Sequence, residues 1–179
     1  MILIERRVAM QDMFCMRLCD QTHLEEILTI QEEAIAALPQ PHLLNRNTPQ
    51  LFETVLTAPN VTVGAFDGER LAGFASLFHP QTHEDDLSHT LETVDVSGKK
   101  VANYKVTIVR ETYRGHRLQQ RMEQELERYA KEQGVQILCV TVSPDNLPNK
   151  RNIEKCGYTY DHTQIKYGNL LRDIYYKVL

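Results

Sequence analysis

The sequence predicts an α/β (α+β) sandwich built around a mixed β-sheet. The first observation is the order of apolar patterns along the chain, which we interpret as β, α, α, β, β, β, α, β, α, β, β. The second is the β-loop-α-β portion over residues 100–142, because two strands joined through a helix form a right-handed parallel crossover. The third is length: 179 residues can remove roughly 70% of their unfolded surface from water. With no repeat or linker visible, we expect a single domain over residues 1–179.

The first third of the chain is interpreted as one strand and two helices. Residues 13–19, "MFCMRLC", alternate with a period of two, which predicts a strand. Thr22 and Glu25 have the spacing of a capping box and precede apolar residues at helical intervals, until Pro39 stops the helix. A second helix is expected to begin at Thr48, since a proline follows at its first position.

A hairpin and a long polar segment follow. Residues 61–66 and 70–78 are predicted strands joined across Asp67-Gly68, a dipeptide that readily supplies the positive φ of a tight turn. The segment 79–99 is mostly polar and acidic, without clear periodicity. A connection of this length in a compact domain is typical of a mobile functional loop.

The second half begins with a strand, a helix and a strand. Residues 100–109 form the first of these strands, followed by a basic loop and a helix from about Leu118 to Gln133 with one apolar face. Residues 135–142 are a nearly continuous apolar, β-branched run, which is typical of a strand buried on both faces.

The last elements are a short helix and a hairpin. The helix is expected over Leu147–Lys155, with Asn146 as its N-cap and Gly157 just past its end. Residues 158–166 and 170–178 are the two final predicted strands.

Composition and charge exclude several classes of protein. The chain carries 20 Lys and Arg against 24 Asp and Glu, a net charge of −4, so it lacks the basic field of a nonspecific nucleic-acid binder. No apolar run approaches the roughly 20 residues of a membrane span, and the N-terminus lacks a signal peptide's apolar region. The four cysteines form no CxxC pair, and the histidines of segment 79–99 lack a metal-site pattern. We therefore expect a cytoplasmic protein with reduced cysteines in or near the core, no metal, and neither nucleic-acid nor membrane partners.

The stretch "YRGHRLQQ", residues 113–120, joins the strand 100–109 to the helix that begins near Leu118. A helix N-terminus presents unpaired backbone N–H groups and roughly half a positive charge, and both suit an anionic phosphate. Each N–H bonded to a charged oxygen contributes about 1.5–3 kcal/mol. The alternative is that this loop only turns a strand into a helix, with its arginines solvated.

Residues 106–158 resemble the GNAT acetyltransferase superfamily in two places. Where that family reads R/Q-x-x-G-x-G/A at a strand-to-helix junction, this chain reads "RGHRLQ" from Arg114 to Gln119. The family then has an Asn that opens a helix and an aromatic residue after a Gly, here Asn146 and Gly157-Tyr158. The resemblance implies a mostly antiparallel central sheet of about seven strands with helices on both faces. It also implies an acyl-CoA-dependent N-acetyltransferase with acetyl-CoA as the donor.

The resemblance further implies which residues bind coenzyme A. In the family, backbone groups of the strand before the loop bind the pantetheine arm, the loop and helix N-terminus bind the pyrophosphate, and the Asn contacts the arm in many members. The matching positions are Ile108, Val109, Arg114, Gly115, His116, Arg117, Leu118, Gln119, Gln120 and Asn146. The side chains of Ile108 and Val109 are also expected in the core, and Asn146 is equally well explained as an N-cap alone.

Two departures from the family pattern bear on cofactor binding. Arg117 and Gln119 occupy the positions of the two motif glycines. If these positions take helical dihedrals, N–H donation survives and Arg117 adds a cation near the phosphates. If they require positive φ, a residue with a Cβ costs about 1–2 kcal/mol. We expect helical dihedrals at both positions.

The catalytic groups stay unassigned from sequence. Many family members protonate the departing thiolate with a Tyr seven residues after the Asn, and that position is Ile153 here. Tyr158, Cys156 and Asn152 are the nearest polar groups, although we expect the first two in the core and Asn152 on a solvated helix face. Water is a further alternative. The strand before the loop carries no Asp or Glu as general base.

The acceptor implied by the resemblance is the primary amine of a small molecule. The acidic segment holding His83, Glu84, Asp85, Asp86 and His89 either supplies the base, attracts a cationic amine, or only keeps a surface loop solvated. A second hypothesis is a non-catalytic acyl-CoA-binding sensor or regulatory module, favoured by Ile153. A homodimer is expected if residues 2–4 form an extra strand, or if the final strand pairs across two copies.

Overall fold

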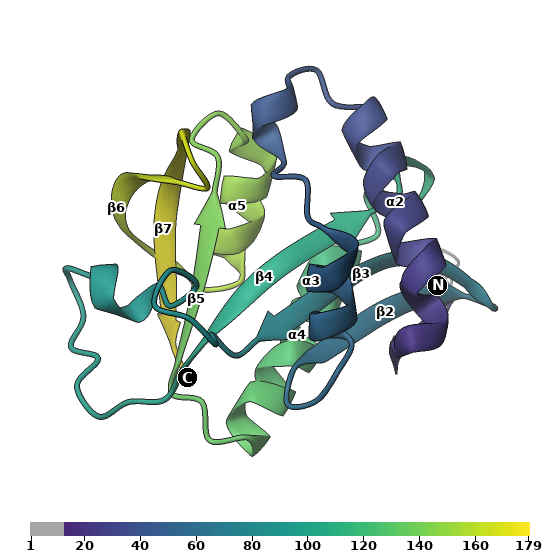
Figure 1. Ribbon diagram of the computed structural model, residues 1–179. Coiled ribbons are helices and arrows are strands. Elements are labelled where there is room, and N and C mark those ends of the chain that lie inside the picture. Colours follow the sequence, from purple (N-terminus) through teal and green to yellow (C-terminus); the bar gives the residue numbers. More distant parts are fainter. Residues whose placement is uncertain (1–12) are drawn as a thin grey trace, which may run out of the picture.

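A seven-stranded sheet with helices on both faces forms the molecule, a computed structural model that describes residues 13–179 (Figure 1). The strand order is β1-β2-β3-β4-β5-β7-β6, and only the β4–β5 pair is parallel. This arrangement confirms the predicted fold class. The proposed extra strand at residues 2–4 lies outside the described residues. The strands are β1 (Phe14–Leu18), β2 (Val61–Asp67), β3 (Arg70–Phe78), β4 (Val101–Val109), β5 (Ile137–Val142), β6 (Thr159–Lys166) and β7 (Leu170–Val178).

The helices form two layers, one on each side of the sheet. The helices are α2 (Leu24–Ala36), α3 (Pro49–Val55), α4 (Leu118–Glu132) and α5 (Leu147–Lys155). We call the side covered by α2 and α3 the front face, and the side covered by α4 and α5 the back face (Figure 1). On the front face, Phe52 of α3 packs edge-to-face on Phe74 of β3, with ring centroids 5.8 Å apart. On the back face, α4 buries Leu118, Met122 and Leu126.

The sheet opens between β4 and β5. These strands pair only over Val101–Asn103 and Ile137–Cys139, and beyond that point they diverge (Figure 1). On its other side β4 stays paired with β3, except at a bulge where Lys105 is the extra residue of β4. A bulge bends its strand and re-aims a side chain. The divergence leaves the β5-facing backbone of β4 without a strand partner after Asn103.

Most helix ends follow the predicted caps, with one exception. Thr48 caps α3 and Asn146 caps α5, each through a side-chain oxygen, as expected. The prediction of Thr22 as the first N-cap is wrong: Asp20 caps the 3-10 turn Gln21–His23 that leads into α2, and its Oδ1 accepts the Thr22 N–H at 2.9 Å. The His23 Nδ1 in turn accepts the Asp20 N–H at 3.1 Å. A histidine thus replaces the usual glutamate of the capping box. The helix α2 itself follows His23, which makes no side-chain cap bond to it within the described residues.

The segment 79–99 is packed in place against the front face. Leu87 is 3% exposed and shares a small core with Ile137 and Cys139 of β5. The Asp161 carboxylate of β6 accepts the backbone N–H groups of Glu92 and Thr93, both at 2.9 Å. Leu87, Glu92 and Thr93 therefore hold this segment against the sheet, while the His83, Glu84 and His89 side chains are exposed, as the solvated-loop alternative predicts.

The cysteines are all free thiols. Cys19 and Cys139 are buried and Cys156 is half-buried, as predicted. Cys15 is exposed, so the expectation of a core or near-core position is wrong for it. It lies on β1, an edge strand of the sheet within residues 13–179.

Candidate functional site

Unpaired backbone N–H groups collect at the start of α4. Within residues 13–179, no N–H of residues 115–120 has an acceptor, whereas the Arg121 N–H donates to the Arg117 carbonyl at 3.1 Å and begins the helical ladder. Gly115 has φ 84° and Arg117 has φ 57°. Left-handed residues in such a loop turn successive N–H groups toward one side and form a concave anion site. The positive end of the α4 dipole adds to it.

Arg117 departs from the expected backbone conformation. Its φ of 57° and ψ of 27° are left-handed, so the prediction of helical dihedrals is wrong here, while Gln119 lies within α4 as predicted. The left-handed conformation costs a residue with a Cβ about 1–2 kcal/mol. Leu118, only 2% exposed, offsets this cost by starting the helix with its side chain in the core. Glycine stands at this position in the family motif because it lacks that penalty.

Side-chain amides connect α4 to α5 beside the N–H groups. Gln119 Nε2 donates to Asn149 Oδ1 at 2.8 Å, and Asn152 Nδ2 donates to Gln119 Oε1 at 3.0 Å. The prediction of a solvated Asn152 is therefore wrong. Asn146 Oδ1 accepts the Asn149 N–H at 3.2 Å, which is the N-cap bond. These bonds hold the N-termini of both back-face helices at the opening between β4 and β5.

A narrow cleft of about 90 Å³ occupies this opening. Ile153 of α5, the position of the family Tyr, is 1% exposed and lines it. The predicted pantetheine strand continues past it: Ile108 is 6% exposed and Val109 packs against the core, as expected for their side chains. The remaining walls are Leu43–Asn45, Asn47, Tyr104–Thr107, Gln119, Val140–Ser143, Asn149, Tyr167 and Arg172.

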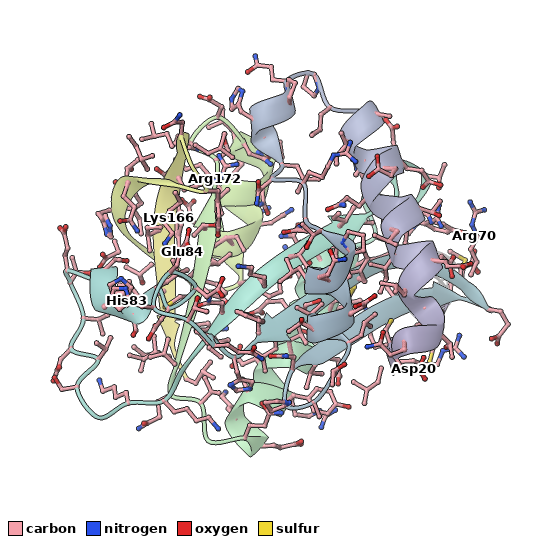
Figure 2. All side chains as sticks on the ribbon, in the orientation of Figure 1. Asp20, Arg70, His83, Glu84, Lys166 and Arg172 are labelled. Carbon is pink, nitrogen blue, oxygen red and sulfur yellow. The ribbon has the colours of Figure 1, made fainter. Side chains whose placement is uncertain are left out.

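A second cavity of about 390 Å³ lies between the α2–α3 connection, the segment 79–99, Lys105 of β4 and the end of β6. Figure 2 shows Glu84 and Lys166 over this end, and Lys166 Nζ donates to the Glu84 carbonyl at 3.1 Å. The acidic segment therefore does reach a cavity, through Glu84 and Asp85. The walls are Asn45–Thr48, Leu51, Glu84, Asp85, Lys105 and Ile165–Gly168.

Lys105 and Tyr167 stand where the cleft and the second cavity meet, since both line both spaces. The Lys105 ammonium lies 3.3 Å from Asp85 Oδ1 and 5.7 Å from the centre of the Tyr167 ring. The Tyr167 hydroxyl lies 3.2 Å from Thr141 Oγ1 of β5. Tyr167 has φ 52°, an uncommon conformation for a residue other than glycine that is often found at functional sites.

The sequence interpretation missed Tyr167. Its only signal was a bulky residue directly before the Gly168-Asn169 turn, and nothing local relates that turn to β5. The tyrosine that the sequence did suggest, Tyr158, is buried against Tyr104 and lines neither cavity. Burial raises the pKa of the Tyr158 phenol well above its usual value, and it raises the pKa of the Cys156 thiol to about 12. Neither group is placed to donate a proton in the cleft.

Metal-ligand clusters and membrane-spanning helices are both absent from residues 13–179. No group of three or more His, Cys, Asp or Glu side chains in this range could hold a metal ion. No helix in the range is long and apolar enough to cross a membrane.

The splayed mixed sheet, with a helix N-terminus that presents free N–H groups within residues 13–179 beside its opening, is the architecture of an acetyltransferase-type α/β protein. The chain belongs to the acetyltransferase (GNAT) family, whose model matches residues 24–158. This confirms the resemblance that the sequence suggested. No curated protein sequence matches the chain.

Solved structures with the same fold include proteins that were determined with a cofactor. A candidate acetyltransferase from Acinetobacter baylyi ADP1 is 21% identical, with a TM-score of 0.70 and 93% of each chain covered. A candidate acetyltransferase from Salmonella typhimurium, solved with its cofactor acetyl-CoA, is 13% identical with a TM-score of 0.70, and 94% of this chain and 95% of that chain are covered. NAA60 of Arabidopsis thaliana in complex with acetyl-CoA is 17% identical with a TM-score of 0.69, covering 93% and 98%.

Proposed function

We propose that this chain is an acetyl-CoA-dependent N-acetyltransferase that acts on the primary amine of a small molecule by direct attack. We further propose that residues 1–179 form one domain and that the protein works in the cytoplasm without a metal. The observation that carries the proposal is the row of unpaired N–H groups over residues 115–120, set beside a cleft between β4 and β5. Family membership and the acetyl-CoA complexes of two similar structures support it.

In this proposal the cofactor lies along the back-face side of the cleft. Residues 115–120 bind the pyrophosphate through backbone N–H groups, with the exposed Arg114 and Arg117 side chains nearby. The backbone of Ile108 and Val109, free of a strand partner on its β5 side, binds the pantetheine arm in sheet-like fashion. Asn146 keeps its capping bond and presents its amide N–H groups to the arm. These contacts place the thioester near Lys105 and Tyr167.

The reaction needs a neutral amine, an acceptor for its proton and a donor for the thiolate. The amine enters through the second cavity and attacks the thioester carbon; the C–N bond forms and the C–S bond breaks. Tyr167 donates its phenolic proton to the departing sulfur and is reprotonated by the proton that the amine releases. Before the attack, Glu84, whose carboxylate is exposed in the second cavity, removes the first proton from the ammonium, directly or through water, and passes it to solvent; the proton released when the C–N bond forms is the one that returns to Tyr167.

The release of free thiol tests this function. The protein is incubated with acetyl-CoA and, in turn, polyamines, amino acids, aminoglycosides and short peptides. We expect thiol release with at least one class, with kcat/KM rising with pH as the ammonium, of pKa about 10.4, loses its proton. Absence of thiol release over the whole panel counts against the proposal.

A second candidate function is favoured by the aliphatic Ile153 in the cleft. A non-catalytic acyl-CoA-binding module has no need of a proton donor at that position. It predicts that coenzyme A raises the melting temperature while no amine is acetylated. At 100 times the dissociation constant the added stability is about 2.7 kcal/mol. An unchanged melting temperature contradicts both functions.

A further inference from the structure

Arg172 of β7 is a buried cation that has no carboxylate partner among residues 13–179. It is 3% exposed, and it donates from Nη1 to the Leu171 carbonyl and from Nη2 to the His42 carbonyl, both at 2.9 Å. Within residues 13–179 it forms no ion pair. Burial lowers the pKa of its guanidinium, because the charged form is poorly solvated there. A guanidinium has five N–H donors, so three remain for a ligand.

Ser143 is a second buried donor beside it. Ser143 is 3% exposed, its hydroxyl has no partner within the described residues, and it lines the same cleft as Arg172. The last paired residues of β5 and β7 are Val142 and Asp173. Ser143 and Arg172 are the next residues in the same register, so they lie opposite each other. Residues opposite each other in an antiparallel pair point to the same face.

That face is the front one. Asp173 pairs with Lys150 of α5, and Val142 belongs to the back-face core, so both point backward. Because side chains alternate along a strand, Ser143 and Arg172 point forward. The bond from Arg172 to His42, in the segment between α2 and α3, agrees with this direction. Figure 2 shows Arg172 at the same end of the sheet as Glu84 and Lys166.

We propose that Arg172 and Ser143 form a carboxylate subsite, and that the amine acceptor is a compact amino carboxylate such as an α-amino acid. This inference rests on the proposed function. One guanidinium and one hydroxyl suit a planar carboxylate, which accepts from both. The phosphates of coenzyme A belong to the N-terminus of α4 on the back face, so they do not supply this anion. Arg172 and Tyr167 line the same cleft, so the subsite adjoins the proposed proton donor.

Matched acceptor pairs test the subsite. The wild-type protein is assayed with acetyl-CoA and phenylalanine against phenethylamine, histidine against histamine, and tryptophan against tryptamine. For at least one pair we expect kcat/KM to favour the amino acid by about 100-fold, the cost of leaving a buried cation unpaired. Equal use of amino acid and amine in every pair overturns the inference.

Variants assign the preference to the two residues. Arg172→Met is expected to bring the amino acid to amine ratio to within about threefold, and Ser143→Ala to reduce it about tenfold. Arg128→Met, at an exposed arginine of α4 that lines neither cavity, is the control and should keep the wild-type ratio. If Arg172→Met lowers turnover of both acceptors equally, Arg172 only anchors His42 and the inference fails. If Arg172→Met does not fold, the Ser143→Ala ratio decides.

Two further arms separate other sources of the result. Selective loss of turnover with succinyl-CoA in Arg172→Met, with the acceptor ratio unchanged, would assign the subsite to the acyl group and overturn the inference. If no amine is acetylated at all, the proposed function fails, and binding then tests the subsite. In that case phenylalanine, but not phenethylamine, should raise the melting temperature of the wild-type protein saturated with coenzyme A. Failure to do so overturns the inference.

Discussion

The two sides of the β4–β5 cleft are built in different ways. On the back face, the proposed anion site comes from one continuous stretch, residues 115–120, and consists of backbone N–H groups. On the front face, the second cavity is assembled from side chains of the α2–α3 connection, the segment 79–99, β4 and the β6–β7 turn. The first kind of site leaves a motif in the sequence, and the second leaves none. The proposed cofactor side therefore carries a family motif, and the proposed acceptor side carries none.

The largest effect is expected from a carboxylate placed in the backbone site. Gly115→Asp puts a negative charge where the phosphates bind and a Cβ at φ 84°. We expect the dissociation constant of acetyl-CoA, measured by calorimetry, to rise about 100-fold, or about 2.7 kcal/mol. Gly134→Asp is the matched control, because Gly134 has φ 74° at the other end of α4. Gly134→Asp should lose a similar amount of stability and keep its affinity for acetyl-CoA. If it also binds acetyl-CoA more weakly, the binding site is not confined to the start of α4.

Removing one hydroxyl on the acceptor side should affect turnover and leave cofactor affinity intact. Tyr167→Phe is expected to lower kcat about 10-fold, at the low end for a general acid, because a thiol of pKa about 8.5 leaves readily. Steady-state kinetics at several pH values measures this change. Tyr160→Phe, whose hydroxyl bonds Thr163 on the exposed side of β6, is the control. Unchanged kcat in Tyr167→Phe would leave solvent as the proton donor.

The buried middle of α4 should behave as scaffold and not as site. Glu123 is 2% exposed, and burial raises the pKa of its carboxyl. Its contribution to stability is therefore full at low pH and is lost as the pH rises through that raised pKa. We expect Glu123→Gln to raise the melting temperature by about 2–4 °C at pH 8, which corresponds to about 1 kcal/mol of stability. Below about pH 4 the variant and the wild type should have the same melting temperature, because the glutamate is then protonated. A changed KM for acetyl-CoA would contradict the scaffold role.

The smallest effect concerns strain at the helix start. Arg117→Gly removes the Cβ from a left-handed residue, which should stabilise the fold by about 0.5 kcal/mol after the entropy of glycine is subtracted. Arg114→Gly, at φ −65° and ψ 159°, has no strain to relieve and should be slightly destabilised. The melting temperatures of Arg117→Gly and Arg114→Gly should therefore change in opposite directions, the first upward and the second downward. Equal shifts would show that the strain at Arg117 is negligible.

The sequence predicted the elements well where their signals are local. The strands, Thr48 and Asn146 as caps, and the buried back-face side of α4 all depend on spacing over a few residues, and the structure confirms them. Arg117 was misjudged because an αL N-cap depends on how the loop meets the helix, which residue identity does not reveal. The bridge from Gln119 to Asn152 joins residues far apart in sequence, as does the approach of Tyr167 to Thr141. Contacts of this kind depend on the packing of the whole sheet, so no local sequence pattern predicts them.

The most direct test of the central claim is an amide-resolved NMR titration with coenzyme A. If the unpaired N–H groups at the start of α4 bind its phosphates, the amide resonances of residues 115–120 should shift most, together with those of Ile108 and Val109. The amides of Gly134 and the rest of the α4 C-terminus should stay in place. Saturable binding whose largest shifts fall elsewhere, or no binding at millimolar coenzyme A, would contradict the account.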